Sequence, residues 1–243
     1  MAAKLHFGPA RVPSQASPEE AVELLLARAN DIALSVHAPI AGFMGHAERG
    51  KKLNMAVGML DHSAGIAVAA GAAPVVFHPG FLLGRTREDA IDSVVEQLGE
   101  LRERLEKKDR GVPFGIEVMG RVRDLGSLDD VVEIARRLDW VRPVIDFAHM
   151  HATSDGAFTS VEPFLEALEL ADGVIEPDAP FHIHFSDIQF ANRNETKHLP
   201  YGEGTLRAEH LRDALARFER PATVISESPD AASTDTIKSI LGA

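Results

Sequence analysis

The stretch that decides the fold is FHIHFSDIQFANRNETKHLPYGEGTL, which runs from Phe181 to Leu206. It opens with alternating histidines and apolar residues. A strand here would therefore direct His182 and His184 to one face of a sheet and the apolar side chains to the other. Imidazoles are unusual in an apolar core, but they are the nitrogen ligands that a divalent ion such as zinc prefers. The stretch indicates a metal site, provided that other parts of the chain supply carboxylates.

The composition limits what kind of protein this is. The chain has 243 residues, of which 45% are hydrophobic, which suits one large α/β domain over residues 1–243. It has no cysteine, so a metal site must be built from His, Asp and Glu. Its formal net charge of −12 argues against the broad basic surface that is typical of nucleic-acid binders.

The sequence carries no sign of a membrane protein. No apolar run approaches the roughly 20 residues that span a bilayer. The first residues, MAAKLHFGPA, lack the basic and then apolar pattern of a secretory signal. We therefore expect a cytoplasmic protein that has no membrane partner and that is a monomer.

Strand-like and helical segments alternate along the chain. The expected strands are 5–7, 32–36, 74–77, 113–116, 141–145, 181–185 and 222–226. The expected helices are 17–29, 53–71, 85–107, 127–138, 161–170, 206–218 and 234–241. This alternation predicts parallel strands that are covered by helices, either in a doubly wound sheet or in a closed barrel.

The polar residues at the strand ends favour the barrel. One such residue stands at or near the carboxyl end of each of six strands: His37, His78, Glu117, Asp146, His184 and Glu227. In a barrel these ends form one ring around one pocket, whereas an open sheet would spread them in a row. We therefore predict an α/β fold of the TIM type, a (β/α) barrel with parallel strands.

A metal ion explains the repetition of these polar residues. A single histidine at a strand end is commonly a hydrogen-bonded structural residue. Several buried imidazoles and carboxylates in the same position of successive βα units need a common partner, and a cation is the simplest one. Other histidines do not fit this pattern: His46, His62 and His210 are interpreted as surface residues, and His182 as a polar residue of the barrel interior.

Motifs along nearly the whole chain resemble the endonuclease IV family of apurinic/apyrimidinic-site nucleases, and its archaeal-type branch in particular. The motifs that carry the resemblance are FGPA, SVHAP, VFHPG, GIEVMG, VIDFAHMHA, HIHFSD, KHLPYGEG and ISES. The family has a (β/α)8 barrel with three zinc ions and cuts the phosphodiester 5′ to an abasic sugar. The resemblance thus implies a zinc enzyme, with manganese as an alternative ion, that acts on DNA containing abasic sites.

The resemblance also implies three ligand sets. They are His37, His78 and Glu117; the bridging Glu117 with Asp146, His184 and Glu227; and His149 with His198. Metals in such a cluster activate a water molecule and clamp the oxygens of an in-line displacement. Glu117 would be the catalytic residue that orients the resulting hydroxide.

The chain departs from the family in three places. The family's third metal takes an aspartate where this chain has Thr196, and Glu195, with its longer side chain, is the candidate substitute. Only seven strand-like segments are found, because the second βα unit is missing. Ile40 stands where bacterial members have an aromatic wedge, so it is a candidate apolar contact to DNA. Gly202 and Gly204 are candidate substrate-binding residues, with a plain turn as the alternative.

Two other functions are compatible with these residues. A sugar isomerase or epimerase of the xylose-isomerase-like class needs one metal, which Glu117, Asp146, His184 and Glu227 could hold. Such an enzyme has no need of the four additional histidine ligands. A barrel that has lost catalysis, or that only binds a ligand, is the third hypothesis.

Overall fold

The computed structural model describes residues 4–6 and 33–242. The strands are β1 (Lys4–His6), β2 (Val36–His37), β3 (Val75–Phe77), β4 (Phe114–Glu117), β5 (Val141–Asp146), β6 (Phe181–Phe185), β7 (Asp187–Ala191), β8 (Asn194–Leu199) and β9 (Ala222–Ser226). The helices are α2 (Lys51–Ala70), α3 (Arg87–Glu106), α4 (Leu128–Arg137), α5 (Phe147–Thr153), α6 (Val161–Asp172), α7 (Ala208–Leu215) and α8 (Ala231–Leu241).

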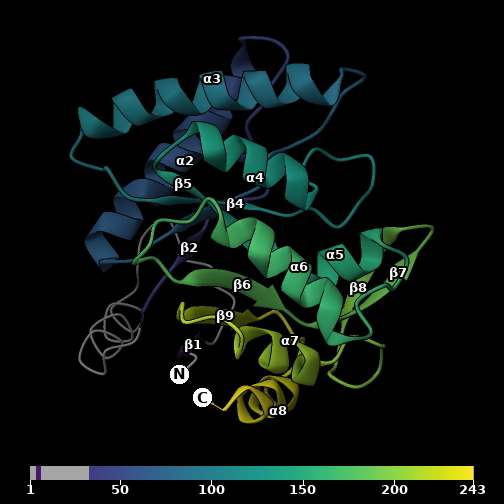
Figure 1. The fold of residues 1–243 in the computed structure, drawn as a ribbon. Coiled ribbons are helices and arrows are strands. Elements are labelled where there is room, and N and C mark those ends of the chain that lie inside the picture. Colours follow the sequence, from purple (N-terminus) through teal and green to yellow (C-terminus); the bar gives the residue numbers. More distant parts are fainter. Residues whose placement is uncertain (1–3, 7–32, 243) are drawn as a thin grey trace.

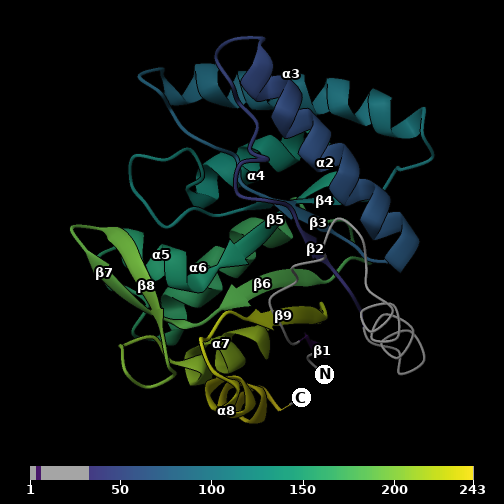
Figure 2. The ribbon, with the colours of Figure 1, turned by 180° about the vertical axis from the view of Figure 1, so that it is seen from behind.

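Seven strands form one parallel sheet in the order β1-β9-β6-β5-β4-β3-β2. Helices lie along the outside of these strands, as Figures 1 and 2 show from opposite sides. The predicted TIM-type fold with parallel strands is confirmed. The helix expected over 17–29 lies outside the described residues, as does most of the region where the family has its second βα unit.

The register of the sheet brings the predicted site residues together. Asp146 on β5 pairs with His184 on β6, so their side chains lie side by side on the same face. On the other side of β5, Glu117 of β4 pairs with Val144, which lies one pleat before Asp146. Because side chains alternate along a strand, all three functional groups point to one face of the sheet near its carboxyl end.

Two elements were not predicted. Asp146 is the last residue of β5 and also the N-cap of helix α5. Its Oδ1 accepts a hydrogen bond from the backbone N–H of His149 at 2.7 Å. Strands β7 and β8 form an antiparallel hairpin that projects beyond the carboxyl ends of the sheet strands, next to α5 (Figures 1 and 2). Both elements carry candidate metal ligands, so they extend the site beyond the sheet.

A buried ion cluster fastens α2 to the end of α3. Asp61 on α2 is only 3% exposed and accepts hydrogen bonds from three cations, Arg104, Lys108 and Arg110. Burial alone would raise the pKa of the Asp61 carboxyl, but hydrogen bonds from these cations lower it to about 2. The cluster is remote from the strand ends, so we assign it to stability.

We predict that Asp61→Asn lowers the free energy of unfolding by about 2–3 kcal/mol at pH 7, because three cations lose their buried counter-ion. The folded-state pKa is depressed, so the contribution of Asp61 is present above about pH 4 and is lost as the pH falls towards about 2. Urea denaturation as a function of pH measures both effects. Asp213→Asn is the matched control, since the Asp213 side chain is 50% exposed. Equal losses in the two variants would contradict the assignment.

Candidate metal centre

Three groups of potential ligands gather at the carboxyl ends of the strands. They are His37, His78 and Glu117; Glu117, Asp146, His184 and Glu227; and His149, Glu195 and His198. Within each group, one ligand atom from each residue lies within 4.8 Å of the others. All nine residues that the sequence suggested as ligands are brought together, in the same three sets. That they hold metal ions stays a prediction.

Glu117 is the junction of the first two groups. It is 1% exposed, and its Oε2 lies 2.9 Å from Nε2 of both His37 and His78, while its Oε1 lies 2.7 Å from Nδ1 of His184. Burial alone would raise the pKa of Glu117, but the surrounding imidazoles, His184 foremost, hold it well below its usual range. Glu117 is therefore ionised at neutral pH, and three imidazoles converge on it.

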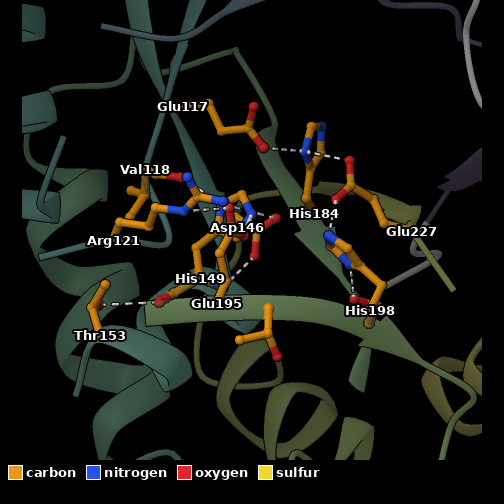
Figure 3. Close-up of polar contacts among 12 residues, drawn as sticks. Glu117, Val118, Arg121, Asp146, His149, Thr153, His184, Glu195, His198 and Glu227 are labelled. Carbon is orange, nitrogen blue, oxygen red and sulfur yellow. Dashed lines mark hydrogen bonds and ion pairs between the residues drawn. The ribbon is translucent and has the colours of Figure 1, made fainter. Parts of the chain in front are cut away.

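His184 links Glu117 to Glu227 (Figure 3). Its Nδ1 lies 3.2 Å from Oε1 of Glu227, and its side chain is 3% exposed. Burial lowers the pKa of His184, but the charges of Glu117 and Glu227 outweigh burial and raise it well above the usual value. In return, Glu227 has its pKa lowered to about 2, against the effect of its own burial. An ion in this group would replace the imidazole proton as the positive partner of both carboxylates.

Asp146 fits a cation for a further reason. Its Oδ2 atom is buried and has no hydrogen-bond partner among the described residues. Burial, as the main cause, raises the pKa of Asp146 to about 6. A buried carboxylate oxygen without a donor is costly, and a metal bound between Asp146 and His184 would satisfy it.

Hydrogen bonds orient two of the imidazoles for binding through Nε2. His37 donates from Nδ1 to the carbonyl of Ala38, and His149 donates from Nδ1 to the carbonyl of Val118, both at 2.8 Å. In a neutral imidazole this leaves the Nε2 lone pair facing a carboxylate, Glu117 or Glu195 respectively. Two acceptors in such contact need a proton or a metal between them, and this tautomer is the one found in many metal sites.

Glu195, and not Thr196, completes the third group. Oε2 of Glu195 lies 2.8 Å from Nε2 of His149, whereas the Thr196 hydroxyl donates to the carbonyl of Gln189. Glycine at position 120 permits this approach, because a Cβ there would lie 2.5 Å from Oε2 of Glu195. The carboxylate that the sequence placed one residue early is thus in position.

The third group is connected to the second. His198 lies on β8, where Nε2 is 3.8 Å from Oε2 of Glu227 and Nδ1 is 2.6 Å from the hydroxyl of Ser186. Burial lowers the pKa of His149, but Asp146 and Glu195 raise it well above its usual value. The three groups therefore form one continuous network of imidazoles and carboxylates.

The candidate substrate-binding residues have different surroundings. Ile40 follows β2 and is 75% exposed, so it is free to contact a ligand. The amides of Gly202 and Gly204 both donate to Oδ2 of the buried Asp187, and a Cβ on Gly204 would lie 2.2 Å from the other oxygen. These glycines hold their loop against Asp187, and their contact with a substrate stays a prediction.

The surface assignment of His46 was wrong. His46 is 8% exposed and stacks on Phe43 with ring centroids 4.6 Å apart. Gln97 of α3 fixes the loop, accepting from the amides of Gly45 and His46 and donating to the His46 carbonyl. His182 is buried as expected, at 2% exposed.

The fold and the site define a (β/α) barrel with histidine and carboxylate groups at the carboxyl ends of its strands. The chain belongs to the xylose isomerase-like TIM barrel family, whose model matches residues 4–241. No helix among the described residues combines the length and apolar character needed to cross a membrane.

Of two proteins with a similar sequence, one is uncharacterized and the other is named a probable endonuclease 4. An uncharacterized protein of Methanocaldococcus jannaschii is 31% identical over 157 residues, which are 64% of this chain and 57% of that protein. A probable endonuclease 4 of Latilactobacillus sakei is 27% identical over 198 residues, which are 78% of this chain and 64% of that protein. The chain thus spans less than two thirds of either relative. The resemblance found in the motifs is confirmed.

Three solved structures share the fold. Endonuclease IV from Thermus thermophilus has a TM-score of 0.70 at 16% identity, over 98% of this chain and 87% of that one. A D-tagatose 3-epimerase-like protein has a TM-score of 0.72 at 21% identity, over 93% and 82%. The IOLI protein, solved with a zinc atom, has a TM-score of 0.62 at 18% identity, over 90% and 78%. At these identities the likeness shows the fold alone.

Proposed function

We propose that the protein is a metal-dependent endonuclease that hydrolyses the phosphodiester 5′ to abasic sites in DNA. The observation that carries the proposal is the presence of three adjacent ligand groups, of which two share Glu117. One metal ion needs a single group, whereas a phosphodiester with attacking, non-bridging and leaving oxygens suits several neighbouring ions. We assign zinc, with manganese as an alternative, at two or three ions per chain.

The contacts of the site residues suggest a separate role for each of them. When bound, the ions supply a lowered pKa for water and a positive charge for the phosphate oxygens. Glu117 stays ionised, so it would orient the attacking water and keep the first two groups together. Ile40, Gly202 and Gly204 would contact the DNA. Under this proposal the protein acts as a monomer in the cytoplasm.

A single-metal sugar isomerase or epimerase is the second candidate. The group of Glu117, Asp146, His184 and Glu227 is by itself sufficient for one ion. This hypothesis gives no role to the close contact of His149 with Glu195 or to that of His37 and His78 with Glu117. The first proposal uses all of these contacts, so we favour it.

A nicking assay tests the proposed function. A duplex that carries one tetrahydrofuran abasic analogue should be cut 5′ to the lesion in the presence of zinc or manganese, leaving a 3′-hydroxyl that a DNA polymerase extends. An undamaged duplex is the control, and D-tagatose and D-psicose are tested in parallel for epimerisation. Turnover of a sugar together with an intact lesion strand would replace the nuclease by the second candidate.

We predict that Gly120→Ala reduces the number of bound ions by one. A Cβ at position 120 would lie 2.5 Å from Oε2 of Glu195, so Glu195 must move away from His149. Gly58→Ala is the control, because that Cβ meets nothing within 4 Å. Metal analysis of the purified variants measures the change. An unchanged ion count in Gly120→Ala would mean that Glu195 is not a ligand.

A further inference from the structure

A cavity of about 270 Å³ opens beside the third ligand group. Its polar lining includes the guanidinium-bearing residues Arg87, Arg121 and Arg193 and one acid, Asp124, while Met119 and Met150 contribute apolar wall. Arg87 is ion-paired with Asp130 and Arg121 lies 3.7 Å from Glu195, so Arg193 is the lining arginine that has no ion pair among the described residues, in a chain whose net charge is −12. Such a lining favours an anionic ligand.

Arg193 is held at the cavity by an unusual turn. Asn192 and Arg193, between β7 and β8, both have positive φ angles, 52° and 61°. Two such residues joining antiparallel strands are typical of a type I′ turn, where Asn-Gly is the preferred pair. Arginine in the left-handed region is disfavoured, and residues kept in such conformations are common at functional sites. The conformation of this turn therefore favours a functional role for the side chain of Arg193.

The side chain of Arg193 is oriented but not neutralised. Its Nε donates to the carbonyl of Thr153 at 2.7 Å, which fixes the direction of the guanidinium plane. Within the described part of the chain, neither terminal nitrogen has a hydrogen-bond or ion-pair partner. A guanidinium fixed by Nε with two free terminal donors is preorganised for the two oxygens of a phosphate.

The cavity is tied to the candidate metal centre by backbone contacts. The amide of Glu195 donates to the carbonyl of Gly120 at 2.8 Å, and Arg121 forms a β-bridge with Asn194. The Nε atom of Arg121 lies 3.7 Å from Oε1 of Glu195. Val118, whose carbonyl accepts from His149, also lines the cavity, and Figure 3 shows Val118 and Arg121 on one side of His149. An anion in the cavity would therefore lie next to the third ligand group.

We propose that this cavity binds a phosphate group of the DNA strand, adjacent to the phosphodiester that is cut, with Arg193 and Arg121 as its main donors. The inference rests on the proposed function and makes it more specific. It also gives a strongly acidic chain a local basic site for a polyanion. A neutral sugar would give the terminal nitrogens of Arg193 no anionic partner, so the cavity favours the nuclease over the epimerase.

The first test follows phosphate directly. In the zinc-loaded protein, the side-chain Nε–Hε signals of Arg193 and Arg121 should shift saturably with inorganic phosphate, while the signal of Arg136 stays in place. In Arg193→Ala the response of Arg121 should require about tenfold more phosphate, the scale of one charged hydrogen-bond donor. Phosphate that shifts neither arginine would overturn the proposal, whether or not the chain cuts DNA.

The second test separates the phosphate sources and the two proposals. Arg193→Ala and Arg121→Ala should each raise the KM for the abasic duplex about tenfold at unchanged kcat. Each should also reduce the slope of log KM against log salt concentration by about one, because one phosphate contact is lost. Arg136→Ala, on the exposed surface of α4, is the matched control and should change nothing. Ribose 5-phosphate that binds the cavity more tightly than an oligonucleotide would overturn the assignment to DNA. Phosphate binding without any nicking would support the cavity and reject the nuclease.

Discussion

Glu117→Gln should abolish nicking of the abasic duplex, with a loss in kcat/KM of roughly 10³-fold, the scale of removing one preorganised group from a catalytic centre. Glu117 is 1% exposed and its carboxylate contacts three imidazoles, so the amide would remove a negative charge that all three share. The amide also weakens the ligand set of two groups at once. Metal analysis of the variant should therefore find fewer ions as well as lower activity.

Two further variants separate chemistry from folding. Glu133→Gln, on the exposed surface of α4, removes the same charge away from the site and should leave the activity unchanged. Glu117→Asp keeps the charge on a shorter side chain and should retain the fold if Glu117→Gln loses it. An activity in folded Glu117→Gln that is close to that of the unchanged chain would rule out Glu117 as the bridging ligand.

Removal of zinc should lower the thermal midpoint by more than about 15 °C. Each ion held at 100 times its dissociation constant stabilises the fold by about 2.7 kcal/mol. In a chain of this size each kcal/mol moves the midpoint by about 2–4 °C. Three ions therefore have a large combined effect, because they replace protons as the partners of buried carboxylates such as Asp146 and Glu117. Thermal unfolding with and without a chelator measures the shift.

The pH dependence of this shift follows from Asp146. Burial raises its pKa in the folded, metal-free chain to about 6, so the proton on Asp146 stabilises the fold at low pH, and this contribution is lost as the pH rises through about 6. The ion replaces that proton, so the chelator should cost more stability at pH 7.5 than at pH 5. Calcium is the control ion, since it prefers oxygen ligands to imidazole. Equal stabilisation by calcium, or no response to the chelator, would contradict a zinc centre.

The sequence was most informative where strands end. Apolar segments that stop at a polar residue predicted strands over 141–145 and 222–226, and the structure has β5 at Val141–Asp146 and β9 at Ala222–Ser226. In a parallel barrel the carboxyl ends of all strands lie at one face. Residues that occupy the same position at the end of successive strands are therefore close together in the fold. This is why Glu117, Asp146 and His184 could be grouped before the structure was known.

Contacts between distant segments could not be predicted in this way. The turn between β7 and β8 is formed by Asn192 and Arg193, which both have positive φ. The Asn-Gly pair that usually predicts such a turn is not present there. Glu195 reaches His149 because a glycine stands at position 120, on another strand's loop. His46 is buried because Gln97 of α3 binds its backbone. Each of these facts depends on a partner that is remote in the sequence.

The central claim is that the carboxyl ends of the strands hold several metal ions and not one. Crystals of the zinc-loaded protein, measured on both sides of the zinc absorption edge, test it most directly through their anomalous difference map. We predict two or three peaks, each in a different ligand group, with Glu117 between the first two groups. A single peak among Glu117, Asp146, His184 and Glu227, with the histidines of the other groups unoccupied, would contradict the account and favour the isomerase.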